Sequence, residues 1–238
     1  MNYLTAAIAW LNDPLNWTNP GGILQRLGEH LEISAAAVLL GCLIAWPIGL
    51  WLGHVGRGGG VVVLVSNVTL AIPTLALLCI IPLTGVGIGQ PAIILALTVF
   101  AIPPLLANAY TGLREVDPQI RDAARGMGLS GGQMLRRVEL PLALPYLAAG
   151  FRTAAVQVVA TAALASFVAG GGLGQIIAEG AGLGLSVAGG QVVAGALLVA
   201  LLALSVEGVF AVVERLVTPR ALRRSGRVRR SGATAANV

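Results

Sequence analysis

The chain has 238 residues, of which 56% are hydrophobic and only 11% are charged, and its mean hydropathy is +0.86. Water-soluble domains carry about a quarter charged residues, so the composition excludes a typical soluble protein and indicates one solvated mainly by lipid. The net charge of +5 comes from arginine, because the sequence contains no lysine. We interpret this charge as anchoring on the cytoplasmic side of a membrane, and not as nucleic-acid binding.

Residues 1–22 form an N-terminal segment that is too short, and too interrupted by Pro14 and Pro20, to cross a bilayer. The segment also lacks the charged start and small-residue cleavage site of a signal peptide. Tryptophan favours the headgroup region. We therefore predict an extracytoplasmic, interfacial segment with Trp10 and Trp17 at headgroup depth.

Five later stretches are long and apolar enough to cross the hydrocarbon core, which takes roughly 20 residues. Lipid offers no hydrogen-bond partners to exposed strand edges, and barrel-like alternation is absent, so each stretch is expected to be a helix. The fold class is therefore all-α, a polytopic membrane protein with about five transmembrane helices. The predicted spans are Ile33–Gly53, Val61–Leu83, Pro91–Tyr110, Leu147–Ala169 and Gln191–Val213.

The arginines predict the orientation, because cytoplasmic loops are enriched in basic residues. With five spans, fourteen of the fifteen arginines fall on one side and only Arg26 falls on the other. This places the N-terminus outside and the C-terminus in the cytoplasm. The membrane domain is predicted to cover 23–217, and 218–238 to form a basic, disordered cytoplasmic tail.

No catalytic or nucleotide-binding motif is recognisable in the sequence. The glycine run at 56–60 lacks the Lys-Ser/Thr that follows a phosphate-binding loop, and no zinc-ligand spacing or nucleophile elbow occurs. We expect a non-enzymatic chain that binds no cofactor. If ATP drives it, another chain must bind the nucleotide.

Residues 113–144 form a polar segment between the third and fourth spans. Asp117 can cap a helix that starts at Pro118, and Gly126 and Gly128 can end it. Ser130, with Gln133 three residues later, predicts a second helix through a capping box. The segment is therefore expected to be a cytoplasmic helix–turn–helix.

The chain is expected to break or bend where it re-enters the membrane. Leu140-Pro141 and Pro145 follow the second predicted helix. Proline lacks the backbone N–H that a helix interior uses.

The spacing of this polar segment resembles the EAA loop of ABC importer permeases of type I. That loop reads E-A-A, three residues, Gly, nine residues, Ile-x-Leu-Pro. The resemblance implies a coupling element that docks on a cytoplasmic ATPase; the alternative is an interfacial hairpin without a partner. The matching residues are Asp122, Ala123, Ala124, Gly128, Val138, Leu140 and Pro141, with Asp for Glu and Val for Ile.

Over roughly 20–220 the chain looks most similar to the osmoprotectant branch of these permeases (ProW/ProZ and OpuB-like). The resemblance implies a bacterial cell-membrane importer of glycine betaine, carnitine, choline or similar quaternary amines. It also implies a partner ATPase that holds ATP–Mg, a second permease subunit, identical or paralogous, and an extracellular substrate-binding protein. Methionine and sulfonate permeases share some of the segments that carry it, which are 29–34, 67–78, 108–113, 123–130 and 167–175.

Polar residues inside the spans are candidates for the transport pathway, because such residues usually face a bundle interior or a cavity. The alternative is that they join helices by hydrogen bonds. Glu207 has no basic neighbour in sequence within its span, so we expect it to reach toward the interface, and no chemistry is assigned to His30 or His54. The pathway candidates are Asn67, Thr69, Pro73 and Thr74 on the second span and Thr153, Gln157 and Thr161 on the fourth.

Two other classes of protein compete with the importer reading. A self-sufficient secondary transporter would carry coupling-ion carboxylates near the midplane and inverted repeats. A membrane scaffold would need no polar stripe in its spans. The docking-like segment favours the importer subunit over both.

Overall fold

The computed structural model describes residues 2–168 and 170–217, so the predicted tail 218–238 lies outside the described residues. In this part of the chain every regular element is a helix. The elements are α1 (Tyr3–Leu11), α2 (Leu15–Thr18), α3 (Ile23–Val55), α4 (Gly59–Ala71), α5 (Thr74–Ile80), η1 (Ile81–Thr84), α6 (Gln90–Arg114), α7 (Pro118–Gly126), α8 (Gly131–Met134), η2 (Leu135–Glu139), α9 (Leu140–Ala162), η3 (Ala163–Phe167), α10 (Gly174–Gly182) and α11 (Leu185–Val217).

Helix α6 lies at the centre of the bundle and packs against α3, α9 and α4. Its buried residues Leu97, Ala101 and Leu105 belong to the main apolar core. Small residues bring α3 and α6 close together: a Cβ added at Gly49 would lie 2.7 Å from Ala109 Cβ. Such contacts replace the hydrophobic effect, which does not drive helices together in lipid.

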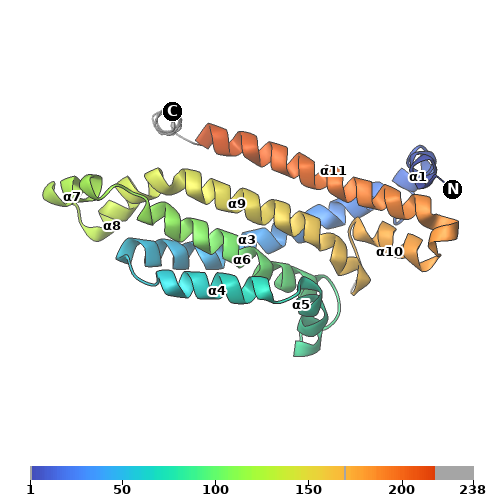
Figure 1. Cartoon of the computed structure of the whole chain (residues 1–238), viewed down its shortest axis with the longest axis horizontal. Coiled ribbons are helices and arrows are strands. Elements are labelled where there is room, and N and C mark those ends of the chain that lie inside the picture. Colours follow the sequence, from blue (N-terminus) through green and yellow to red (C-terminus); the bar gives the residue numbers. More distant parts are fainter. Residues whose placement is uncertain (1, 169, 218–238) are drawn as a thin grey trace, which may run out of the picture.

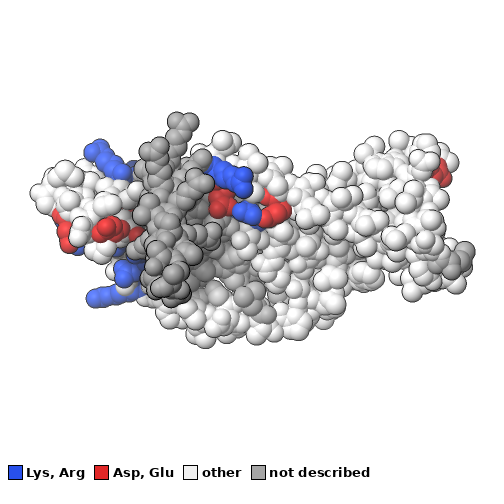
Figure 2. Space-filling view, turned by 45° about the horizontal axis from the view of Figure 1, so that its top comes forward, with Lys and Arg blue, Asp and Glu red and all other residues white. Residues whose placement is uncertain are grey.

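The long helices run between two ends of the molecule (Figure 1). The short helices α7 and α8 lie at one end, where α11 also ends, whereas α1 and α10 lie at the other. On the face drawn in Figure 2, most charged side chains lie in the half that carries α7 and α8. The rest of this face is almost uncharged, as expected for a surface in contact with lipid.

The all-α membrane architecture is confirmed. Four helical runs are long and apolar enough to cross a bilayer, and they contain or overlap the predicted first, third, fourth and fifth spans. Each run extends beyond the predicted span. The fourth begins at α8 and passes through α9 into the 3₁₀ helix η3.

The predicted second span, Val61–Leu83, is a sharply bent pair of helices in the structure. Residues 59–69 and 74–84 form a pair of helices bent by 80°, which counts as a fifth crossing only if the pair is taken together. Pro73 has no N–H to donate, and it disfavours helical geometry at the preceding residue. Ile72 is accordingly extended, with φ −80° and ψ 122°.

The break or bend predicted at Leu140-Pro141 and Pro145 does not interrupt the helix. Helix α8 continues through the π-helical turn η2 into α9, and Pro145 lies inside α9. In the π turn the Leu140 N–H donates to Leu135 O, five residues back. This wider turn brings the chain to Pro141 in the first turn of α9, where a missing N–H costs little.

A pair of matched alanine substitutions tests the close packing of α3 on α6. A Cβ at Gly49 meets Ala109 Cβ at 2.7 Å and Leu106 O at 2.9 Å, whereas a Cβ at Gly28 of the same helix meets nothing within 4 Å. We expect Gly49→Ala to lower the unfolding free energy by about 1–3 kcal/mol. Gly28→Ala should leave it unchanged or raise it by about 1 kcal/mol. Equal melting temperatures of the two variants in detergent would contradict this packing.

Candidate functional site

Helix α7 begins and ends through local hydrogen bonds that its sequence supplies. The Asp117 carboxylate accepts from the Gln119 N–H at 2.8 Å. At the other end the Gly128 N–H donates to Arg125 O and the Leu129 N–H donates to Ala124 O, which is the Schellman pattern. Gly128 has φ +81°, a left-handed conformation that glycine adopts without strain.

A capping box starts the next helix. The Gln133 N–H donates to Ser130 Oγ at 3.4 Å, and the Ser130 N–H donates to Gln133 Oε1 at 2.9 Å. Together with the glycine turn, these bonds give the segment between α6 and α9 a defined shape. This segment is therefore a structured projection at one end of the bundle (Figure 1).

The residues with coupling-loop spacing fall into two groups, one on the α7–α8 projection itself and one where the projection joins α9. Asp122, Ala123 and Gly128 are exposed, whereas Ala124 is turned inward and buried. Ile120 and Met127 extend the outward apolar surface, with 44% and 74% of their surfaces exposed. An uncovered apolar helix face of this kind can lie in a groove of a partner protein.

The remaining residues of that spacing lie at the base of the projection. Val138 and Leu140 are half-buried in η2 and at the start of α9, and Pro141 is exposed. They lie on the helix that carries the projection, and not on α7 itself. A turn separates α7 from α8, and the continuous helical run from α8 into α9 begins after that turn.

Sequence reasoning missed a buried carboxylate at this base. Glu139 is only 2% exposed; its Oε2 lies 2.5 Å from His54 Nδ1 and its Oε1 lies 3.2 Å from Arg121 Nε. Arg121 also donates to the Leu113 carbonyl at the end of α6. No local pattern predicts this cluster, because His54 and Glu139 are 85 residues apart.

The pathway candidates lie on two helices that both pack against α6. Asn67 and Thr69 are on α4, and Pro73 and Thr74 are at the break before α5. Thr153, Gln157 and Thr161 are on α9, where the two threonines donate to carbonyls of their own helix. Among the described residues, none of the seven forms a hydrogen bond to another helix, and their role in transport remains a prediction.

Glu207, which has no basic neighbour in sequence within its span, is paired with an arginine of another helix. Arg152 on α9 donates to both oxygens of Glu207, through Nε at 2.9 Å and through an N–H of its terminal nitrogens, and also to Glu214 at 2.8 Å. A hollow of about 590 Å³ beside these groups is also lined by Thr153 and Gln157. Arg152 and Glu207 are 55 residues apart, so only helix packing brings them together.

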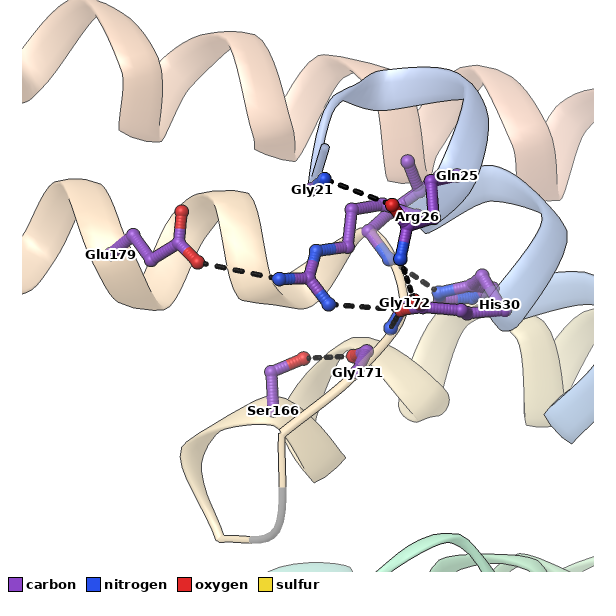
Figure 3. Close-up of polar contacts among 10 residues, drawn as sticks. Gly21, Gln25, Arg26, His30, Ser166, Gly171, Gly172 and Glu179 are labelled. Atoms are coloured by element: carbon purple, nitrogen blue, oxygen red, sulfur yellow. Dashed lines mark hydrogen bonds and ion pairs between the residues drawn. The ribbon is translucent and has the colours of Figure 1, made fainter. Parts of the chain in front are cut away.

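A second polar cluster lies beside α10, at the end opposite to α7 (Figure 1), and Figure 3 shows its contacts. Gly170, Gly171 and Gly172 have positive φ and form the loop before α10. The Gly172 N–H donates to Glu29 Oε2 at 3.1 Å, and the Leu173 N–H donates to His30 Nδ1 at 3.2 Å. Two segments 143 residues apart, 29–34 and 167–175, are therefore in direct contact.

His30 also joins α3 to α9. Its Nδ1 accepts from Leu173, so its Nε2–H donates to Val159 O at 2.9 Å, and the ring is only 1% exposed. Arg26 adds ion pairs to Glu29 and Glu179, at 3.0 and 3.5 Å. These bonds hold the glycine loop and α10 against the end of α3.

The described residues contain no group of three or more His, Cys, Asp or Glu side chains that could hold a metal ion. Their polar clusters are ion pairs and backbone hydrogen bonds.

Residues 37–219 match the family described as the binding-protein-dependent transport system inner membrane component. The chain belongs to this family. It is a multi-pass inner-membrane permease of a binding-protein-dependent transport system. The matched range includes the α7–α8 projection, the broken α4–α5 pair and the glycine loop.

Curated relatives cover most of this permease. It is 41% identical to the glycine betaine/carnitine/choline transport system permease protein OpuCB of Bacillus subtilis, over 86% of this chain and 93% of the relative. It is 40% identical to the choline transport system permease protein OpuBB of the same organism, over 87% and 94%. Identity to the osmoprotectant import permease protein OsmW of Salmonella typhimurium is 32%, over 86% and 96%.

A solved structure has the same fold. The permease resembles a chain of the MetNI methionine ABC transporter, described in inward-facing conformations, with a TM-score of 0.75 and 26% identity. The match covers 87% of this chain and 100% of that chain. The helix arrangement is therefore that of an ABC transporter permease.

Removing the imidazole of His30 tests the loop attachment. His30→Leu leaves the Leu173 N–H and the Val159 carbonyl without their partner. An unsatisfied buried group costs about 1–3 kcal/mol, so hydrogen exchange at 170–175 should accelerate. Glu32→Leu, at an exposed position of the same helix, is the control, and equal protection in both variants would contradict the attachment.

Proposed function

We propose that this permease is the pore subunit of an ATP-driven importer of osmoprotectants such as glycine betaine, carnitine or choline. The observation that carries the proposal is the 40–41% identity, over 86–87% of the chain, to permeases named for these substrates. The relatives match nearly their whole length, so the comparison covers the membrane domain and not one shared motif. The chain itself performs no catalysis.

The α7–α8 projection is the proposed docking element for the partner ATPase, which binds ATP–Mg. Its outward residues Ile120, Ala123 and Met127 offer a small apolar surface, and Asp122 and Arg125 lie beside it. Apolar contact supplies affinity, and flanking charges set orientation. Gly128 supports this role because its left-handed turn fixes the angle between α7 and α8.

The same end is the proposed cytoplasmic end. Arg57, Arg114 and Arg215 lie at the ends of helices there, near the arginines of α7 and η2, whereas Arg26 lies at the other end. The basic bias favours an extracellular N-terminus and a cytoplasmic C-terminus. Electrostatic attraction to anionic headgroups of the inner leaflet supports this orientation.

Substrate selection is proposed to reside mainly in a separate extracellular binding protein. Quaternary amines are recognised by several aromatic rings around one point, yet only 5% of the residues are aromatic. A second permease subunit would complete a weakly binding pathway past Asn67, Thr69, Pro73 and Thr74 and past Thr153, Gln157 and Thr161. Methionine is the second candidate substrate, because the MetNI transporter shares the fold.

A valine at Gly128 tests both the docking and the orientation. The φ of +81° makes any β-branched residue strained there, at a cost of about 1–3 kcal/mol. We expect Gly128→Val to insert into the membrane but to lose ATPase binding and uptake. Gly182→Val, at an exposed helical position of α10 with open space around it, should keep both.

The binding measurement uses purified ATPase and membrane vesicles of each sidedness. ATPase should bind to inside-out vesicles of the parent chain and not to right-side-out vesicles. Binding to the right-side-out vesicles would contradict the orientation. Full binding and uptake by Gly128→Val would contradict the docking role.

Competition uptake identifies the substrate class. In a strain without other importers, unlabelled glycine betaine, carnitine or choline should reduce uptake of labelled glycine betaine, and methionine should not. In the same assay Gln157→Leu should slow uptake while ATPase binding stays unchanged. Inhibition by methionine alone would overturn the osmoprotectant assignment, and normal uptake by Gln157→Leu would remove that residue from the pathway.

A further inference from the structure

Glu139 is a buried carboxylate at the point where the α7–α8 projection, the proposed docking segment, joins the membrane helices. We propose that Glu139 is a positioning residue that transmits displacement of α7 to α3 and α9 through Arg121 and His54. The proposal rests on the proposed function, because it assumes that a partner ATPase moves α7. It adds three residues that the coupling-loop spacing does not include.

The first step is that the Glu139 carboxylate depends on its partners. Only 2% of this residue is exposed, and its two oxygens contact Arg121 Nε at 3.2 Å and His54 Nδ1 at 2.5 Å. A charge removed from water is tolerated only when it is paired and hydrogen-bonded. A displacement that separated Arg121 from Glu139 would leave the carboxylate with His54 alone and the guanidinium without an ion partner, so the two groups move together.

The second step is that α7 has little other attachment to the bundle. Its backbone packs closely against α8, and its inward residues are Arg121 and the small Ala124. Arg121 reaches two elements at once, since it contacts Glu139 in η2 and donates to the Leu113 carbonyl of α6. The guanidinium is therefore the main polar link between the docking helix and the membrane helices.

The third step concerns what lies beyond Glu139. It is the last residue of the π turn and directly precedes α9, while His54 lies in the last turn of α3. The carboxylate thus joins the ends of α3 and α9. A π turn is a single wide turn in a helix that often lies at functional sites, and here it separates the docking segment from the span.

The fourth step is that α3 and α9 are joined at both ends by the only two histidines of the chain. His54 contacts Glu139 just before α9, and His30 donates to Val159 near the other end of α9. The two helices also pack against each other between these points. A pull on Glu139 would therefore move α3 and α9 together and reach the glycine loop that His30 holds.

The experiment separates transmission from simple stabilisation. Six proteins are reconstituted with the ATPase and the binding protein: the parent chain, Glu139→Gln, Arg121→Gln, the double variant, His54→Gln and Glu32→Gln. The last is the control, because Glu32 is an exposed carboxylate of α3. Three quantities are measured: the melting temperature, ATPase binding, and glycine betaine imported per ATP hydrolysed. The ratio of import to hydrolysis is a quantity that a merely stabilising contact would not change.

Each single substitution, Arg121→Gln or Glu139→Gln, removes one member of the ion pair and should lower the melting temperature. The double variant removes both charges and should regain most of that loss, since replacing a buried pair by neutral groups is often nearly neutral. ATPase binding should remain in the double variant, but import per ATP should fall by about tenfold, within the range of residues that carry coupling. His54→Gln should keep the Arg121–Glu139 pair and lower the same ratio.

The proposal is overturned if the double variant and His54→Gln both import as much glycine betaine per ATP as the parent chain and Glu32→Gln do. If the double variant does not fold, His54→Gln alone decides by the same ratio. Failure of the proposed function looks different, because the parent chain itself would then neither bind the ATPase nor import glycine betaine.

Discussion

In the hydrocarbon core lipid offers no hydrogen-bond partners, so backbone groups and charged side chains must find them within the protein. This constraint accounts for the helical fold and for the polar contacts inside it. Arg152 is paired with Glu207 and Glu214, and His30 uses both ring nitrogens. The sharp break between α4 and α5, at Pro73, follows a residue whose N–H still donates to a carbonyl of α4.

The polar groups are concentrated at the two ends of the bundle, and rigid helices connect them. At one end Arg26, Glu29 and His30 hold the glycine loop and α10 (Figure 3). At the other end His54, Arg121 and Glu139 join the α7–α8 projection to α3, α6 and α9. An importer must relate events on its two sides, and helices pinned at both ends are suited to carry movement between them.

The fold and the substrate class rest on different observations. The chain of a methionine transporter shares the helix arrangement, whereas the relatives with 40–41% identity are named for betaine, carnitine and choline. One fold hosts many substrates because specificity resides in a few side chains and, in binding-protein-dependent systems, in another subunit. The structural match concerns the helix arrangement, and the substrate assignment rests on sequence identity.

The sequence by itself determined the helical membrane class, most of the spans, and the caps of the docking segment. Hydrophobic length is a property of one continuous segment, and Asp117, Gly128 and the Ser130–Gln133 pair act within one or two turns, so local reasoning was enough for them. Only the tertiary structure decided the partners of Glu139, Glu207 and His30, which come from residues 18 to 143 positions away. It also decided the 80° bend at Pro73 and the continuity of α8 with α9. A proline shows where a helix can break, but packing against neighbouring helices determines whether the chain bends there or continues.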